Sequence, residues 1–320
     1  TELITGVDLV EQMIRVAAGE KLPFQQSDLK INGWAMESRL YAEDPYRNFL
    51  PSIGRLTRYR PPAEEATETR AVRNDTGVYE GGEISMYYDP MIAKLCTWAP
   101  DRATAIEETR LALDGFELEG IGHNLPFLAA VYDHPKFTSG NMTTAFIEEE
   151  YPDGFEGVTL DEDACERIAA AAAAMHRVAE IRRTRISGRM DNHERHVGED
   201  WVVKLQGHAH DAKISADKTG ADVAIAGKTL RVESDWTPGD PLARLTVDGA
   251  PLVLKIGKVS GGFRVRYRGA DVKVHVRTPR QAELMKMENI LRAEKKGTVK
   301  KINAGAGDSL AVDEVIMEFE

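Results

Sequence analysis

The feature that most constrains the fold is a change of hydrophobic period in the second half of the chain. Residues 159–185, TLDEDACERIAAAAAAMHRVAEIRRTR, have acids in the first turn and arginines in the last, as the dipole of a long helix favours. Thr159 and Glu162 have the spacing of a capping box, and six consecutive alanines would allow another element to approach closely. From about residue 200 the period becomes two, with Gly-containing turns between short runs. The pattern predicts a long helix followed by an antiparallel β-barrel or sandwich over residues 159–278.

Charge and composition narrow the class of protein. A chain of 320 residues favours two or three domains. Residues 201–280 hold 14 Lys and Arg against 8 Asp and Glu, a net charge of +6. Because the whole chain has a net charge of −11, the remaining residues have a net charge of −17. This shift in charge predicts a domain boundary near residue 200. The negative total argues against nucleic acid as a partner. No apolar run approaches the roughly 18 residues of a membrane helix, so no membrane role is expected.

The rest of the chain gives weaker structural signals. The segment GVDLVEQMIRVAAGEKL has helical spacing that stops at Gly19, and strand-like runs separated by Pro and Gly follow between Gly33 and Leu95. The N-terminal residues do not read as a signal peptide. Cys96 and Cys165 lie far apart, so we expect free thiols in a reducing compartment. The first 150 residues are predicted to be mixed α and β.

Two polar residues in this first region are candidates for chemistry. Arg39 lies inside the run GWAMESRLYAEDP, with Glu37 and Glu43 nearby. A structural ion pair is the more common role of such an arginine, and a catalytic role is the alternative. Asp89, in SMYYDPMIAKL, could equally start a turn at Pro90.

Two further clusters have an ordinary explanation. A basic run on FRVRYR and VKVHVR could grip phosphates, but we favour the solvated face of an amphipathic strand pair; it comprises Arg264, Arg266, Arg268, Lys273, His275 and Arg277. His193 and His196 lie in a polar loop without a third ligand nearby, and the spacing is not that of H-E-x-x-H. We predict no metal site in this chain.

Lys286 stands between two methionines in QAELMKMENI. On a helix, Leu284, Met287 and Leu291 would share one face, and the lysine would need no special role. The residues after it read as short strands with Gly turns rather than as a helical bundle. At the tip of a hairpin the amine would point outward for modification, with the thioethers as an apolar collar.

Together these motifs resemble the biotin-carrying subunits of biotin-dependent acyl-CoA carboxylases, and among them the enzymes that act on propionyl-CoA. MKMEN resembles the family's biotin acceptor motif, with Lys286 in the acceptor position. The segments GVDLVEQMIRVAAGEKL, GWAMESRLYAEDP, FLPSIGRL, YYDPMIAKL and GHNLPFL resemble the C-terminal part of an ATP-grasp biotin carboxylase domain. The helix and barrel resemble the domain that bridges to a carboxyltransferase subunit.

The resemblance implies a multidomain α+β protein with three parts. Residues 1–150 would be the C-terminal part of the biotin carboxylase domain, 151–280 the helix plus β-barrel bridging domain, and 281–320 half of a β-sandwich biotinyl carrier (lipoyl-like) domain. The ATP-grasp portion would precede Thr1, and the first half of the carrier domain would precede Lys286; the barrel-like run VKVHVRTPR stands there instead. We therefore expect a missing stretch at the 285–287 junction, since half a carrier fold cannot bury its own core.

The resemblance also implies roles and cofactors. Arg39 would face the ureido group of biotin and stabilise its anionic oxygen, Asp89 would lie near that pocket, and Lys286 would carry biotin covalently. ATP and bicarbonate would be substrates of the biotin carboxylase reaction. Mg²⁺ or Mn²⁺ would bridge the nucleotide phosphates through ligands outside this sequence.

The implied partners are a carboxyltransferase β subunit, which would bind the acyl-CoA, and a biotin protein ligase, within a hetero-oligomer in the bacterial cytoplasm or the mitochondrial matrix. Met190 and Arg195, in the loop RMDNHERHV, are the expected contacts with the β subunit. Two alternatives remain open. One is the equivalent subunit of methylcrotonyl-CoA or acetyl-CoA carboxylase, and the other is a scaffold or binding module without catalysis.

Overall fold

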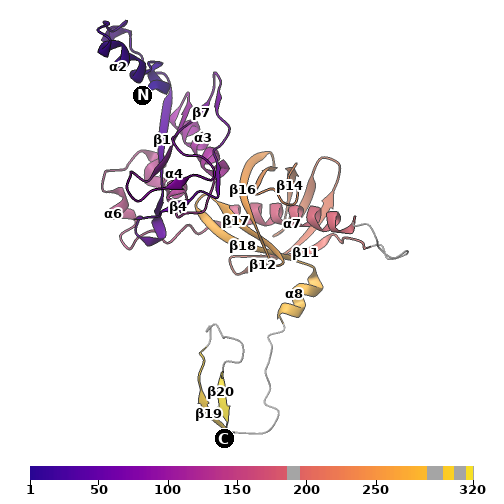
Figure 1. Ribbon diagram of the computed structural model, residues 1–320. Coiled ribbons are helices and arrows are strands. Elements are labelled where there is room, and N and C mark those ends of the chain that lie inside the picture. Colours follow the sequence, from indigo (N-terminus) through magenta and orange to yellow (C-terminus); the bar gives the residue numbers. More distant parts are fainter. Residues whose placement is uncertain (186–194, 287–297, 306–314, 320) are drawn as a thin grey trace. The chain divides into compact units, whose positions relative to one another are not determined.

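The computed structural model describes residues 1–185, 195–286, 298–305 and 315–319 (Figure 1). The chain divides into two compact units, Thr1–Thr278 and Pro279–Glu320. The first unit contains a mixed α/β part and a closed β-barrel. No helix among the described residues is long and apolar enough to cross a lipid bilayer. Both cysteines are free thiols, as expected.

The first part of this unit contains both helices and strands, as the prediction of a mixed α and β region expects. Its helices are α1 Glu2–Thr5, α2 Leu9–Ala17, α3 Arg102–Gly115, α4 Leu125–Asp133, α5 Pro135–Ser139 and α6 Phe146–Glu150, with 3-10 turns at Gln26–Asp28 and Pro45–Arg47. Its strands are β1 Trp34–Tyr41, β2 Glu43–Asp44, β3 Leu50–Pro51, β4 Gly54–Arg55, β5 Arg58–Arg60, β6 Glu65–Ala66, β7 Ala71–Thr76, β8 Glu83–Ile84, β9 Met91–Ala99 and β10 Glu117–Glu119.

An antiparallel four-stranded sheet organises this part, in the order β1-β9-β7-β6. Strand β9, MIAKLCTWA, lies between β1 and β7 and is buried along most of its length, which explains its nearly continuous apolar sequence. Strand β1 pairs with β9 alone within this sheet, and its side chains alternate. Ser38 and Leu40 point into the core that α3 and α4 complete, so Glu37 and Arg39 face solvent.

The predicted helix and barrel are confirmed. Helix α7 spans Glu162–Thr184. Eight antiparallel strands close the barrel, namely β11 Asp200–Leu205, β12 His208–Ala216, β13 Ala221–Ile225, β14 Lys228–Ser234, β15 Leu242–Val247, β16 Ala250–Val259, β17 Gly262–Tyr267 and β18 Ala270–Arg277. The cap of α7 differs from the prediction: the carboxylate of Asp161 accepts the backbone N–H of Ala164 at 2.8 Å. Asp161 directly precedes the first helical residue, and Thr159 lies too early to cap it.

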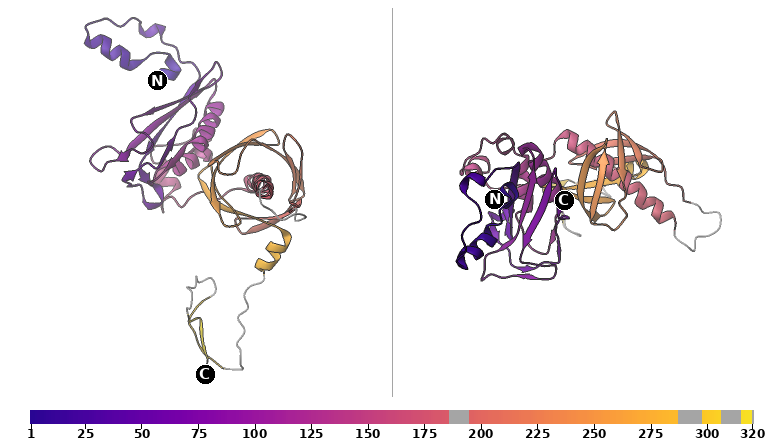
Figure 2. Two further views of the ribbon diagram at one scale, coloured as in Figure 1. Left: turned by 45° about the vertical axis from the view of Figure 1, so that its right-hand side comes forward. Right: turned by 90° about the horizontal axis from the view of Figure 1, so that it is seen from above.

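Helix α7 runs through the inside of the barrel rather than against its outer wall (Figure 2). Ala169, Ala170, Ala171, Ala172 and Ala173 are at most 1% exposed, in one core cluster with the inward side chains of the strands. Methyl side chains keep the helix thin enough for strands to surround it on all sides. The alanine run is therefore the sequence signature of a helix enclosed by a barrel.

The second unit contains helix α8 Pro279–Lys286 and a hairpin of β19 Val299–Ile302 with β20 Met317–Phe319. The expectation that Lys286 lies at a hairpin tip is not met, because its backbone ends α8. The segment AELMK consists of good helix formers, which favours this outcome. Every residue of β19 is exposed.

Candidate functional site

Arg39 lies on the solvent face of β1, where the strand pattern places it with Glu37 and Tyr41. Its Nε atom donates to Glu37 Oε1 at 2.8 Å, and the side chain is 57% exposed. This hydrogen bond raises the pKa of Arg39 and lowers that of Glu37. Lys94 stands opposite Arg39 in the β1–β9 register, and its charge also lowers the pKa of Glu37. Arg39 thus sits in a small ion-pair group and not in a buried cage.

Asn124 fixes the backbone of β1 on either side of Leu40. Its Oδ1 accepts the N–H of Tyr41 at 2.9 Å, and its Nδ2 donates to the carbonyl oxygen of Arg39 at 3.0 Å. The β1–β9 register shifts between Leu40 and Tyr41, so backbone groups there need other partners. Asn124 therefore positions the strand that carries Arg39. The sequence alone assigned Asn124 no role, because an asparagine before a helix is ordinarily its cap; only the structure shows that its buried side chain makes no cap hydrogen bond.

Asp89 is exposed, and its Oδ1 accepts the backbone N–H of Met91 at 2.9 Å. It thus forms the turn that starts β9, as its ordinary explanation predicts. Because Tyr41 pairs with Met91 and Arg39 with Lys94, Asp89 and Arg39 belong to the same end of the β1–β9 pair. Burial, followed by the charge of Asp89, raises the pKa of Glu43. The structure therefore brings positive and negative side chains together at this end of the sheet. An anionic ligand would replace Glu37 as the partner of the Arg39 guanidinium.

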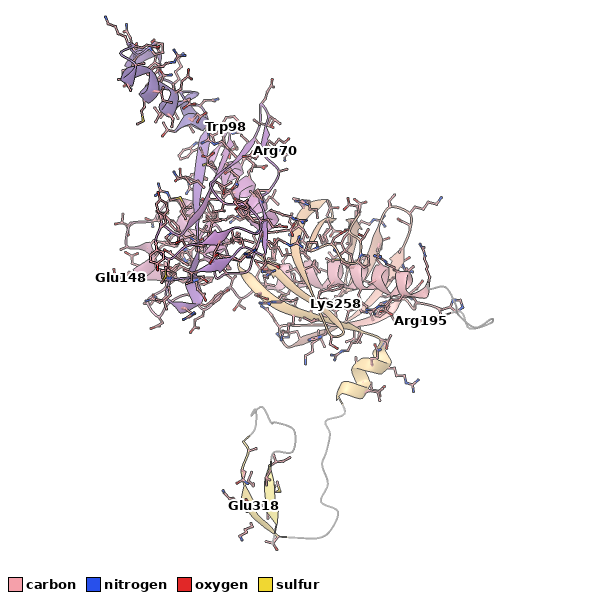
Figure 3. The ribbon with its side chains drawn as sticks, in the orientation of Figure 1. Arg70, Trp98, Glu148, Arg195, Lys258 and Glu318 are labelled. Carbon is pink, nitrogen blue, oxygen red and sulfur yellow. The ribbon has the colours of Figure 1, made fainter. Side chains whose placement is uncertain are left out.

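The other predicted site residues lie elsewhere. Lys286 is the last residue of α8, and the structure describes its backbone only. Met190 lies outside the described residues. Arg195, labelled in Figure 3, is 58% exposed. Its Nη2 donates to Oε2 of Glu180, which is 6% exposed and also pairs with Arg183. Arg195 thus has a structural partner on α7 in addition to any partner protein.

The basic residues of β17 and β18 were predicted to share one solvated face, and this prediction is wrong for Arg268. Arg264 pairs with Asp271 at 2.8 Å and Arg266 with Glu119 at 3.0 Å, each near solvent. Arg268 does not share their solvated face. It occupies the β17–β18 turn with φ 49°, is 13% exposed, and contacts the mixed part through Asp114. Alternation holds only inside the strand, so it fails for a residue in the turn. Among the described residues no group of three His, Cys, Asp or Glu is arranged to hold a metal ion.

Three family models match consecutive parts of the chain. Residues 37–149 match the biotin carboxylase C-terminal domain, 168–287 the propionyl-coenzyme A carboxylase BT domain, and 281–319 the biotin-requiring enzyme family. The second segment contains all of α7 except its first six residues, together with the barrel. The third contains Lys286 and the hairpin of the second unit.

Relatives match the whole chain. It is 65% identical to the propionyl-CoA carboxylase alpha chain of Ruegeria pomeroyi and 35% identical to the mitochondrial one of Rattus norvegicus, with 100% of this chain aligned in both cases. It spans 56% and 45% of the length of those relatives. It is 44% identical to the mitochondrial methylcrotonoyl-CoA carboxylase subunit alpha of Mus musculus over 48% of this chain and 21% of that protein. The resemblance to biotin-dependent acyl-CoA carboxylases is confirmed.

Proposed function

Because three domain families of biotin-dependent carboxylases follow one another along this chain, we propose that it is part of the biotin-carrying α subunit of a propionyl-CoA carboxylase. The observation that carries the proposal is the 65% identity to such an alpha chain over all of this chain. The subunit carboxylates biotin with bicarbonate and ATP, and delivers the carboxyl group to a β subunit that makes methylmalonyl-CoA. The three parts 1–150, 151–280 and 281–320 are its domains.

Lys286 would hold biotin covalently, and a carboxyl carrier tethered there would replace diffusion between two active sites by a high local concentration. Arg39 places a permanent positive charge where negative charge develops on the ureido oxygen. Its exposed position at the sheet edge supports this role, since a ligand can reach the guanidinium. Asp89 holds the neighbouring turn. ATP with Mg²⁺ or Mn²⁺ binds through residues that this chain does not contain.

The proposed partners are the carboxyltransferase β subunit and a biotin protein ligase, in a hetero-oligomer. The greater identity to the bacterial relative than to the mitochondrial one favours the bacterial cytoplasm over the mitochondrial matrix. The alignment with the bacterial relative covers 382 positions, 62 more than the 320 residues of this chain. That relative therefore has residues within the aligned span that have no counterpart in this chain.

A methylcrotonyl-CoA carboxylase is the second candidate. Its support is narrower, because the likeness to that subunit covers 48% of this chain whereas propionyl-CoA carboxylase alpha chains align with all of it. The BT-domain match over 168–287 also favours the propionyl enzyme. Assay of the assembled enzyme with propionyl-CoA, methylcrotonyl-CoA and acetyl-CoA separates the three; a preference for either of the last two would contradict the proposal.

Biotinylation tests the carrier role. The complete subunit that contains this chain is co-expressed with a biotin protein ligase, and its intact mass and streptavidin binding are measured. We expect one biotin on the native subunit, none on Lys286→Arg and one on Lys301→Arg, a matched control on the exposed strand β19. A native subunit without biotin would support the non-catalytic scaffold instead.

Carboxylation tests Arg39. In the complete biotinylated subunit, Arg39→Ala is expected to abolish biotin-dependent ATP cleavage and to leave streptavidin binding intact. Arg55→Ala removes an exposed arginine from β4 of the same part and serves as the control. Carboxylation at the native rate by Arg39→Ala would overturn this role while leaving the carrier role standing.

Co-purification tests whether the loop RMDNHERHV contacts the β subunit. We expect Met190→Ala and Arg195→Ala to weaken retention of the β subunit. Arg195 also pairs with Glu180, so Arg183→Ala, which removes the other arginine on that carboxylate, is the matched control. An equal loss in Arg183→Ala would assign the effect to Glu180 rather than to a subunit contact.

A further inference from the structure

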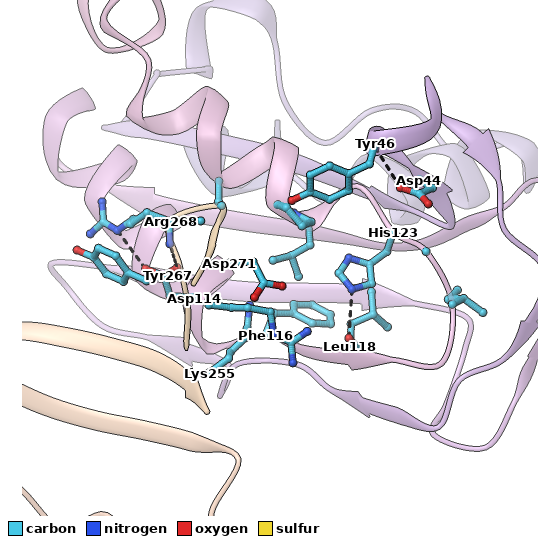
Figure 4. Close-up of a pocket in the computed structure, with 18 residues that line it drawn as sticks. Asp44, Tyr46, Asp114, Phe116, Leu118, His123, Lys255, Tyr267, Arg268 and Asp271 are labelled. Atoms are coloured by element: carbon cyan, nitrogen blue, oxygen red, sulfur yellow. Dashed lines mark hydrogen bonds and ion pairs between the residues drawn. The ribbon is translucent and has the colours of Figure 1, made fainter. Parts of the chain in front are cut away.

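A cavity of about 240 Å³ lies where the barrel meets the mixed part of the first unit (Figure 4). Its walls include parts of α3, α4, β10 and the segment after it, the end of β2 with the following turn, and strands β16 to β18. His123 and Lys255 line it together with Asp44, Asp114, Arg266 and Asp271. This size holds several water molecules or one small polar ligand.

His123 has a polar atom without a partner. Its Nε2 lies 3.2 Å from the carbonyl oxygen of Leu118. A carbonyl only accepts hydrogen bonds, so Nε2 carries the hydrogen and Nδ1 is left as an acceptor. Nδ1 is buried and has no partner among the described residues. Burial lowers the pKa of His123 to about 4, which keeps the ring neutral near pH 7. A ligand that contacts Nδ1 satisfies it only by donating a hydrogen bond.

Lys255 supplies the complementary group. Its Nζ donates to the carbonyl oxygen of Leu113 at 2.9 Å, and no described carboxylate forms an ion pair with it within 4.0 Å. An ammonium group has three donors, so two remain for a ligand. Burial lowers the pKa of Lys255 to about 8, and the charge of Asp114 opposes that shift. The group is therefore still mostly charged at pH 7.

The carboxylates on the walls already have donors. Arg268 binds Asp114 through its backbone N–H and its Nε, both at 3.0 Å. Asp271 accepts Arg264, and Asp44 accepts the backbone N–H of Tyr46 at 3.0 Å. His123 therefore contributes an unpartnered neutral acceptor, and Lys255 an ammonium whose only described acceptor is a carbonyl.

We propose that this junction cavity binds a small oxyanion that still carries a proton, such as a hydrogen phosphate group. Its O–H donates to Nδ1 of His123, and its anionic oxygens accept from the ammonium of Lys255. The group belongs to free phosphate or to a phosphate monoester. Bound there, it links α3 and the following segment to the barrel strands. This inference does not depend on the proposed carboxylase function.

Binding of defined anions to the native chain tests the proposal by calorimetry at pH 6.5 and constant ionic strength. The probes are inorganic phosphate, glycerol 3-phosphate and sulfate. Sulfate has the same shape but no proton to donate, so we expect phosphate to bind at least about tenfold more tightly, the value of one satisfied buried hydrogen bond. Tighter binding of glycerol 3-phosphate than of phosphate identifies a monoester as the ligand, and the reverse identifies free phosphate.

Two substitutions localise the binding. Lys255→Met should weaken phosphate binding at least about tenfold, whereas Lys258→Met, on the same strand and exposed, should not change it. His123→Phe should remove the preference for phosphate over sulfate. If Lys255→Met does not fold, the ¹⁵N resonance of His123 Nδ1 in the native chain decides, because phosphate and not sulfate must shift it. No phosphate binding, or equal binding of sulfate by the native chain, would overturn the proposal and leave water as the occupant.

Discussion

Arg268 and Asp114 make a two-point contact across the junction between the barrel and α3. The backbone N–H of Arg268 donates to Oδ1 of Asp114 and its Nε to Oδ2, each at 3.0 Å. The remaining guanidinium nitrogens reach Glu107 at 2.7 Å and Asp133 at 3.1 Å. Asp114 is 4% exposed, so burial raises its pKa, to about 6, and the charge of Arg268 opposes that shift. One turn residue thus joins the two parts of the first unit.

Replacing Arg268 with alanine should lower the free energy of unfolding by about 3–5 kcal/mol, because the buried Asp114 loses its charged partner. Arg266→Ala is the control. It removes an arginine two residues away whose partner Glu119 is 49% exposed, and should cost no more than about 1 kcal/mol. Urea unfolding measures both. Equal losses of unfolding free energy in the two variants would show that the Arg268–Asp114 ion pair contributes no more than a surface ion pair.

Enlarging Ala171 should destabilise the barrel. The side chain is fully buried, and strands surround α7, so Ala171→Leu forces overpacking that costs about 1–3 kcal/mol or more. Val178→Leu, on the same helix at 45% exposure, should be nearly neutral. Unfolding by denaturant gives the free energies, and near-ultraviolet circular dichroism reports the packing of the buried Trp201 and Trp236. A neutral Ala171→Leu would mean that the helix is not enclosed.

Lowering the pH should reduce the stability of the folded chain through His123. Its pKa is about 4 in the folded chain against the usual 6.5, so the unfolded chain binds the proton more strongly between these values. Stability is therefore lost as pH falls from 6.5 to 4, by up to about 3 kcal/mol. The difference in unfolding free energy between the native chain and His123→Phe, measured in phosphate-free buffer, should change over this range. A difference that does not vary with pH would contradict the burial of the ring.

Removing the side chain of Asn124 should loosen β1. In Asn124→Ala the N–H of Tyr41 and the carbonyl of Arg39 lose their partners, at a cost of about 1–3 kcal/mol. Amide hydrogen exchange at Tyr41 should accelerate at least about tenfold, corresponding to the lower part of that range. Asn74→Ala is the control, since the described bond of that side chain goes to the hydroxyl of Tyr59. An unchanged exchange rate at Tyr41 would show that pairing with β9 alone holds β1 in place.

The sequence by itself determined the elements whose signals are local. The alternation of VKVHVR and similar runs predicted the barrel strands, acids and arginines at its two ends predicted α7, and Gly19 marked the end of the first helix region. The resemblance of MKMEN, GWAMESRLYAEDP and YYDPMIAKL predicted site roles for Lys286, Arg39 and Asp89, and these roles stay predictions. These signals need only period, propensity or a short motif, which neighbouring residues in the chain supply.

Only the tertiary structure decided where those elements lie. The alanine run allowed a close neighbour, but only barrel closure put α7 inside. Arg268 reads as one more basic residue until the β17–β18 turn brings it to Asp114, 154 residues earlier. Asn124 donates to the carbonyl oxygen of Arg39, 85 residues earlier, and His123 and Lys255 line one cavity only because two parts of the unit pack together. Contacts between residues so distant in sequence depend on packing and burial, which local periodicity does not encode.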